Sequence, residues 1–311
     1  MAKVITFGSL KGGVGKTVAS TNVATELALR GYKVLFIDLD PQATSTGYFG
    51  IEPMPAEGTK RLITVGELLY SPHKRYTLDD VVVKHEEIEN LWVTPTHYAA
   101  LDSAESNLDG FARMNAVKKH IVKAAEVSEQ LANLDFIVID TRPSLGVLTD
   151  NALVAADYAV PVCTMFASAA EGAGSFATRI HTLQEDSEAP LSVRTTPWLL
   201  ADWSSTRAGE EAKGLLKTLT HQENPDEAEK FAQLSEEEQE AYVRDFIEAE
   251  APEEVKAKQY FRSKLPHSLD SSKLPGYYGV PAVAVKPNIP FSKAVQAFTD
   301  ELLEYIEATQ N

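Results

Sequence analysis

The segment Lys11–Thr17 has the residue types and spacing of a phosphate-binding loop. It reads KGGVGKT and follows an apolar run at residues 4–7, which predicts a strand, a glycine-rich turn and then a helix. Glycines let successive backbone N–H groups turn toward one point, and the positive end of the following helix adds to the attraction for phosphate. We expect Lys16 to neutralise the β- and γ-phosphates and the Thr17 hydroxyl to ligate Mg²⁺. The sequence therefore predicts a nucleotide site with contacts from Lys11, Gly12, Gly13, Val14, Gly15, Lys16, Thr17 and Val18.

Three aspartates follow apolar runs that are typical of buried strands. Asp38 and Asp40 follow residues 34–37, and Asp140 follows residues 136–139. Because parallel strands joined by helices end at the same edge of a sheet, we expect these carboxylates to lie beside the phosphates. A lone carboxylate at a strand end can simply cap a helix, but the Asp-x-Asp spacing next to a phosphate loop favours catalysis. In phosphate-loop enzymes an aspartate placed like Asp140 holds Mg²⁺, directly or through water.

The rest of the chain alternates strand and helix patterns. We predict strands at 4–9, 34–37, 91–95, 136–140, 159–162, 193–200 and 280–285, and helices at 16–30, 65–70, 102–131, 148–155, 171–183 and 292–308. Gly31 stands where the helix at 16–30 is expected to end. This order predicts an α/β phosphate-loop fold with a mostly parallel, doubly wound sheet flanked by helices, as a single domain over residues 1–311.

Acidic residues outnumber basic ones, and the excess is concentrated in one segment. The formal net charge is −16, and residues 221–258 hold thirteen Asp and Glu against four Lys and Arg. This segment supplies −9 of the −16, which leaves −7 on the rest of the chain and keeps a local basic patch for nucleic acid possible. We interpret 221–258 as a solvated, helical insertion within the domain.

The cysteine count and the hydropathy pattern exclude several classes of protein. The single Cys163 excludes a disulfide framework, fits a reducing compartment and is expected to be an inert core residue. The sequence has no uninterrupted run of about 18 apolar residues, so it predicts no membrane-spanning helix. The phosphate loop begins too near the N-terminus for a signal peptide. We therefore expect a cytoplasmic protein.

With these motifs placed, the chain resembles the ParA family of partition ATPases. The family belongs to the deviant-Walker-A branch of phosphate-loop proteins, which also contains MinD and the nitrogenase iron protein. The matching segments are Lys11–Thr17, Asp38–Gln42, Phe136–Asp140, Pro143–Gly146 and Asn151–Asp157. The lysine at the start of the loop together with Asp-x-Asp-Pro-Gln is specific for the branch, and the run from 143 to 157 favours ParA itself.

The resemblance implies an ATPase that uses ATP and Mg²⁺ and forms a homodimer with ATP between the subunits. Lys11 matches the lysine that reaches the partner's phosphates, Asp40 matches the aspartate that positions the attacking water, and Asp38 lies near the metal. The implied catalytic residues are Lys11, Lys16 and Asp40, and the implied metal site is formed by Thr17, Asp38 and Asp140. ATP-bound dimers of the family bind DNA without sequence preference, and a ParB-type adaptor stimulates their weak hydrolysis. The implied function is plasmid or chromosome partition, in a cytoplasmic protein that associates with the nucleoid when ATP is bound and not with membrane.

Three positions depart from the family pattern. Val18 replaces a usual threonine, Arg142 a common proline, and His267 a frequent arginine. Arg142 could sense phosphate or alter a partner interface. Because His267 removes an expected DNA-contacting charge, the candidate DNA contacts become Arg207, Lys213, Lys264 and Lys273, each of which could equally be an ordinary solvated side chain.

Other functions use related machinery. A ParA-like ATPase that positions a protein cargo would have the same motifs. A MinD-like protein that cycles on membrane needs a basic amphipathic terminal helix, whereas the helix predicted at 292–308 has an acidic polar face. An iron–sulfur reductase needs two cysteines per subunit, and the chain has one.

Overall fold

The structure is a computed structural model that describes most of the chain. Described are residues 2–54, 61–73, 75–108, 112–131, 133–164, 167–185, 191–201, 235, 238, 261–266, 268, 275 and 278–309. Apart from Ser235 and Glu238, the predicted insertion at 221–258 lies outside this part. The prediction of a single domain with a helical insertion therefore stays a prediction.

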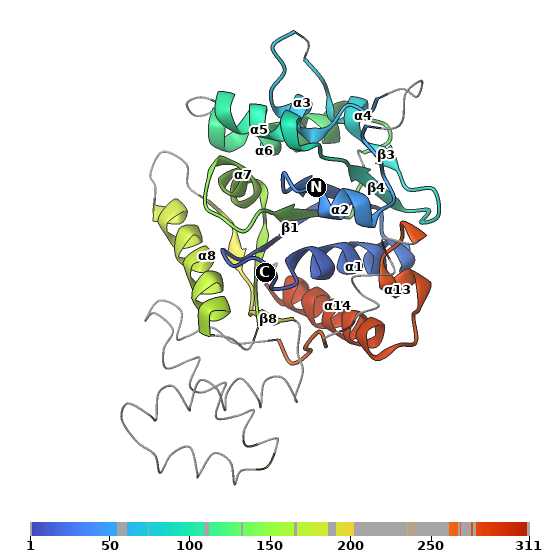
Figure 1. Cartoon of the computed structure of the whole chain (residues 1–311), viewed down its shortest axis with the longest axis vertical. Helices are drawn as coiled ribbons and strands as arrows, with labels where there is room; N and C mark the ends of the chain where they lie inside the picture. Colours follow the sequence, from blue (N-terminus) through green and yellow to red (C-terminus); the bar gives the residue numbers. More distant parts are fainter. Residues whose placement is uncertain are drawn as a thin grey trace.

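A mostly parallel sheet forms the centre of the molecule (Figure 1). Its strands are β1 (Lys3–Gly8), β2 (Val34–Leu39), β3 (Val83–Lys84), β4 (Leu91–Thr94), β5 (Phe136–Thr141), β6 (Tyr158–Cys163), β7 (Arg194–Thr195) and β8 (Leu199–Leu200). They are ordered β3-β4-β2-β5-β1-β6-β7, with β8 also paired to β6. Only β3 pairs antiparallel within the described residues, at the edge beside β4. The predicted fold class is confirmed.

Helices cover both faces of this sheet (Figure 1). They are α1 (Lys16–Leu29), α2 (Thr44–Tyr48), α3 (Val65–Leu69), α4 (Leu78–Val81), α5 (Tyr98–Asn107), α6 (Ala112–Val127), α7 (Val147–Ala155), α8 (Ala167–Glu185), α13 (Ala282–Val285) and α14 (Pro290–Ala308). Side chains alternate along each strand, so Leu35 and Ile37 pack on the face of α6 and α7, whereas Val34 and Phe36 pack on the face of α1 and α14. Two apolar layers result, one on each side of the sheet.

Helix α14 packs beside α1 on the same face of the sheet. Its apolar stripe, Val295, Phe298, Leu302 and Ile306, is buried, as the sequence predicts for a helix packed on the domain. Arg30, just after α1, donates to Asp300 at 2.5 Å and to the carbonyl of Gln296 at 3.0 Å. None of the helices in the described ranges is long and apolar enough to cross a membrane.

Most predicted elements are present, but α2, α4 and β3 were not predicted, α8 begins four residues before the predicted 171, and three predicted elements differ in kind or number. The strand predicted at 280–285 is wrong: residues 282–285 form α13, where Pro281 precedes the first turn and the side chain of Asn22 accepts the Val283 N–H at 3.0 Å. The strand predicted at 193–200 is two short strands, β7 and β8, and the helical stretch at 102–131 is two helices, α5 and α6. Cys163 is fully buried, as expected.

Candidate nucleotide site

The phosphate loop joins β1 to α1 through glycines with left-handed backbones. Gly13 has φ +76° and Gly15 has φ +88°, conformations that side-chain-bearing residues rarely adopt. The Gly15 carbonyl already accepts from the Ala19 N–H at 2.8 Å, so α1 begins immediately after the loop. Around Gly12 and Gly13 a Cβ would meet nothing within 4 Å among the described atoms. The outer side of the loop is therefore open to a ligand.

Lys16 is held in the loop with its charge inside the protein. It is only 6% exposed, and its ammonium donates to the carbonyl oxygen of Lys11 at 3.3 Å. Burial lowers the pKa of Lys16, while the negative charges of Asp140 and Asp40 oppose this effect. A buried lysine next to a single carbonyl is well suited to pair with an incoming phosphate.

Lys11 and Val18 lie at the two ends of the loop. The side chain of Lys11 is exposed, whereas Val14 is buried and Val18 is half-buried against the core. Val18 supplies no hydroxyl, but the Thr17 hydroxyl one position earlier points into the site, toward the end of β5. The loop thus presents one exposed and one buried lysine.

Near the end of β5, the carboxylate of Asp140 has hydrogen-bond partners on only one of its two oxygens among the described residues. Asp140 is fully buried, and its Oδ2 accepts hydrogen bonds from the Thr17 hydroxyl at 2.8 Å and the Ser45 hydroxyl at 2.5 Å. Its Oδ1 is buried without a hydrogen-bond partner in the described part of the chain. Burial raises the pKa of Asp140, against the hydrogen bonds from Ser45 and Thr17 and the charge of Lys16. A nearby divalent cation reverses that penalty.

This arrangement fits Mg²⁺. The ion prefers oxygen ligands, keeps several waters and binds through one or two carboxylates plus phosphate oxygens. The orphaned Asp140 Oδ1 and the Thr17 hydroxyl provide such oxygens beside the buried ammonium of Lys16. That Thr17 and Asp140 hold the metal stays a prediction. The Asp140 oxygen that has no hydrogen-bond partner among the described residues supports it.

Asp38, at the end of β2, has a different environment. It is the register partner of Asp140 in the neighbouring strand and is fully buried. Its Oδ1 accepts from the Asp40 N–H at 3.1 Å, and its Oδ2 accepts from the Thr46 N–H at 3.0 Å and the Thr46 hydroxyl at 2.6 Å. Asp38 therefore holds the start of α2 and the backbone of Asp40. Direct ligation of metal by Asp38 stays a prediction, and its two oxygens are already engaged by protein donors.

Asp40 follows directly after β2 and is close enough to Lys16 and Asp140 to act on both electrostatically. Its side chain is half-buried, and Oδ1 accepts from the Gln42 N–H at 2.9 Å. Its charge acts on both Lys16 and Asp140. The carboxylate is therefore close to where the phosphates would bind, as its predicted role requires, and that role stays a prediction.

Sequence reasoning missed the hydroxyl groups of α2. Ser45 and Thr46 bind Asp140 and Asp38, and the Thr46 hydroxyl also accepts from the Thr96 N–H at 2.9 Å. The only local signal is the run Thr44–Thr46 soon after Asp40. Its partners are 95 and 8 residues away, so only the fold brings Ser45 to its carboxylate.

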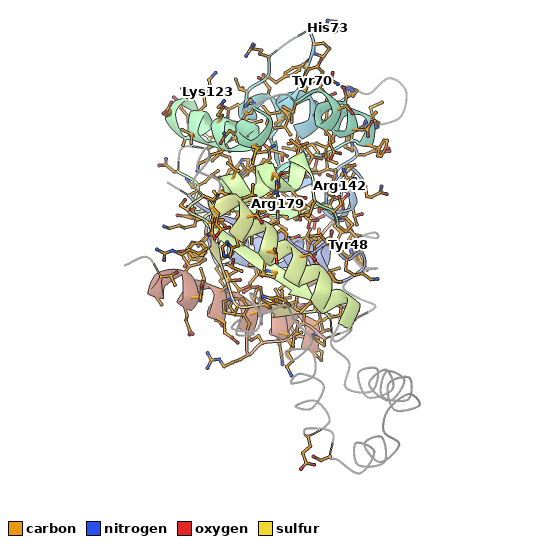
Figure 2. All side chains as sticks on the ribbon, turned by 90° about the vertical axis from the view of Figure 1, so that its left-hand side faces the viewer. Tyr48, Tyr70, His73, Lys123, Arg142 and Arg179 are labelled. Atoms are coloured by element: carbon orange, nitrogen blue, oxygen red, sulfur yellow. The ribbon has the colours of Figure 1, made fainter. Side chains whose placement is uncertain are left out.

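The structure describes only some of the positions that depart from the family pattern and only one of the candidate DNA contacts. Arg142, labelled in Figure 2, forms an ion pair with Glu105 of α5, so its guanidinium is engaged by a carboxylate. Lys264 is half-buried next to Arg262, which lies 3.7 Å from Glu301 and 3.7 Å from Glu304 of α14. Arg207, Lys213, Lys273 and His267 lie outside the described residues.

Comparison with known proteins identifies the family of the chain. A family model described as an AAA domain matches residues 2–193. The sporulation initiation inhibitor protein Soj of Bacillus subtilis is 34% identical over 197 residues, which cover 62% of this chain and 70% of Soj. The chain belongs to the ParA family of P-loop ATPases.

Two further proteins show the reach of this similarity. The chromosome-partitioning ATPase Soj of Treponema pallidum is 34% identical over 169 residues, 54% of this chain and 60% of that protein. Cobyrinic acid a,c-diamide synthase of Mycobacterium smegmatis, with bound ADP and magnesium, has the same fold with a TM-score of 0.68 and 22% identity, over 100% of this chain and 97% of that one. Some relatives are matched over as little as 38% of their length.

Proposed function

We propose that this chain is an ATP-dependent switch that dimerises around ATP and Mg²⁺, binds DNA without sequence preference and drives partition of a plasmid or chromosome with a ParB-type adaptor. One observation carries the proposal. A buried Lys16, an exposed Lys11 and the half-satisfied Asp140 meet at one edge of the sheet in a member of the ParA family. The names of the Soj relatives, which refer to sporulation and chromosome partitioning, support the biological role.

The residues divide the chemistry between them. Lys16 and the loop N–H groups bind the β- and γ-phosphates, and Thr17 and Asp140 would hold Mg²⁺, which would supply positive charge to offset the charge on the phosphates. Asp40 orients the attacking water. Lys11 is exposed, so its ammonium can reach the nucleotide of a second subunit and stabilise transition-state charge only when the dimer forms. Hydrolysis is accordingly slow until an adaptor completes the arrangement.

The DNA-binding step is supported by family membership rather than by a described basic surface. Lys264 is half-buried, and the other candidate cations are outside the described residues. A ParA-like ATPase with a protein cargo would use the same nucleotide site. A membrane-cycling role is disfavoured because α14 buries its apolar stripe and carries Asp300, Glu301, Glu304 and Glu307.

Binding to duplex DNA of arbitrary sequence tests the proposal. We expect binding with ATP but not with ADP, and a steep loss of affinity as salt rises, because phosphate contacts release counterions. Asp40→Ala should trap the ATP dimer and keep it on DNA, whereas Lys16→Ala should bind in neither state. ATP dimers without DNA binding in any state would contradict the DNA role and favour a protein cargo.

A further inference from the structure

Helix α8 touches the phosphate loop through a glycine. The carbonyl oxygen of Gly172 accepts the Leu10 N–H at 3.0 Å. A Cβ built on Gly172 would lie 2.8 Å from the Lys11 nitrogen, 2.9 Å from the Lys11 Cβ and 3.3 Å from the Ser9 hydroxyl. Glycine is the poorest helix former after proline, and no left-handed backbone requires it here. Its presence in α8 is therefore explained by the close approach of the loop.

Two further contacts on the same side of α8 fix the helix in place. Phe176, one turn later, is fully buried with its ring against Gly8 at the end of β1. Arg179, a further turn along and labelled in Figure 2, donates to both carboxylate oxygens of Asp150 in α7, at 2.8 and 2.7 Å. Because the helix is held by this core contact and this bidentate pair, an added methyl group at position 172 would displace the exposed loop rather than α8.

The displaced residue would be the one that orients Lys16. The Lys11 carbonyl is the acceptor for the buried Lys16 ammonium at 3.3 Å. A shift of the Lys11 backbone therefore moves both the exposed lysine and the hydrogen-bond partner of the buried one. The effect of position 172 therefore passes from Gly172 to the Lys11 backbone and from there to Lys16.

We propose that Gly172 is a positioning residue for the nucleotide site. Because Gly172 has no side chain, the phosphate loop can pack directly against α8, and this contact fixes the position of the Lys11 backbone and thereby of Lys11 and Lys16. The inference rests on the nucleotide-binding part of the proposed function and extends it to a helix outside the phosphate loop. It assigns to α8 the role of a fixed support, so that the glycine is required for ligand binding and not for the stability of the helix.

Nucleotide affinity and stability, measured together, test this role. Gly172→Ala should weaken binding of ADP and of a non-hydrolysable ATP analogue with Mg²⁺ about tenfold, because the lysines are misplaced. The dissociation constants can be measured by titration with a fluorescent nucleotide, and stability by the midpoint of thermal unfolding without nucleotide. Thr178→Ala lies on the exposed side of the same helix and is the matched control for increased helix propensity. It should change the dissociation constant neither for ADP nor for the ATP analogue.

A second control separates loop geometry from loss of stability. Leu183→Ala removes a buried side chain near the far end of α8 and should lower the unfolding midpoint while nucleotide affinity stays within about twofold. Affinity that falls in both variants in proportion to stability would overturn the proposal, as would unchanged affinity in Gly172→Ala. If Gly172→Ala binds weakly as expected while the unchanged chain forms no ATP dimer, only the proposed function fails.

Hydrogen exchange on the unchanged chain provides a test that needs no variant. The Leu10 amide donates to Gly172, so we expect it to exchange much more slowly than the exposed Gly12 amide when no nucleotide is bound to protect Gly12. Equal exchange of the two amides would mean that α8 does not hold the loop, and would overturn the proposal even if Gly172→Ala did not fold.

Discussion

The ends of β2 and β5 carry the same residue in the same position, yet their environments differ. Asp38 and Asp140 are register partners in adjacent parallel strands, and both are fully buried. Asp38 accepts hydrogen bonds on both oxygens from protein donors, whereas Asp140 has one oxygen without a partner among the described residues. Both oxygens of Asp38 are engaged by protein donors, whereas Asp140 keeps one oxygen with which we predict it to hold a metal. Hydrogen-bond partners thus distinguish two carboxylates that share residue type and place on a strand.

The largest effect should come from neutralising the half-satisfied carboxylate. Asp140→Asn keeps an oxygen that can accept from Thr17 and Ser45 but removes the charge that would hold Mg²⁺. We expect Mg²⁺-dependent nucleotide affinity to fall about 100-fold or more, because a metal provides several kcal/mol of charge stabilisation. Nucleotide titrations with Mg²⁺ and with EDTA check this. Equal affinity of the variant and the unchanged chain in Mg²⁺ would show that Asp140 does not hold the metal.

Removing a donor from Asp140 should have a smaller effect on the same property. Ser45→Ala deletes one of the two hydrogen bonds to Oδ2, and loss of such an outer partner lowers metal affinity about tenfold. The Mg²⁺ concentration at half-saturation, measured at fixed nucleotide, is the readout. If it does not change, the contact of Ser45 with Asp140 plays no part in metal binding.

The matching change on the Asp38 side should affect stability instead. Thr46→Val removes a hydroxyl that donates to Asp38 and accepts from the Thr96 N–H, which leaves the Thr96 N–H without an acceptor and the buried Asp38 Oδ2 with only the Thr46 N–H as donor. We expect the free energy of unfolding to fall by about 3 kcal/mol, with Mg²⁺ dependence within about twofold of the unchanged chain. Denaturant unfolding measures the first quantity. A large shift in Mg²⁺ dependence would place Asp38 at the metal and remove the contrast between the two aspartates.

The pH dependence of stability tests the Asp38 side without any substitution. Burial, and then the nearby charge of Asp140, raise the pKa of Asp38 from 3.8 to about 7. Because the folded pKa lies above the unfolded value, this group stabilises the fold fully below about pH 4, and the contribution is lost as pH rises through 7. In metal-free buffer, the free energy of unfolding should therefore fall across this range.

Asp38→Asn provides the control for that slope. The amide does not ionise, so we expect a flatter profile between pH 4 and 7 than in the unchanged chain, with the remaining slope due to Asp140, whose pKa burial also raises. Denaturant unfolding at several pH values measures both profiles. Identical slopes would mean that Asp38 titrates in the folded protein as it does in the unfolded one.

Local patterns predicted the phosphate loop well because its geometry depends on neighbouring residues. Gly13 and Gly15 adopt the positive φ angles that the glycine-rich turn requires, and α1 begins at Lys16 and ends before Gly31, at φ +93°. The strands β2 and β5 begin with the continuous apolar runs 34–37 and 136–139, as expected for strands buried on both faces. The strand expected at 280–285 failed because its valines are buried against α1, and an apolar run of that length fits a short helix equally well.

The sequence by itself determined the phosphate-loop motif, the mostly parallel α/β fold and the ParA resemblance, since each is encoded in short segments with fixed spacing. Tertiary structure alone decided which aspartate keeps a free oxygen, which hydroxyls bind the two carboxylates, and why α8 has a glycine at 172. Ser45 and Asp140, which form a hydrogen bond, are 95 residues apart in the sequence. Gly172 lies about 160 residues after the phosphate loop that it contacts. Hydrogen-bond satisfaction and close packing are properties of atoms brought together by the fold, so they appear only when the elements are assembled.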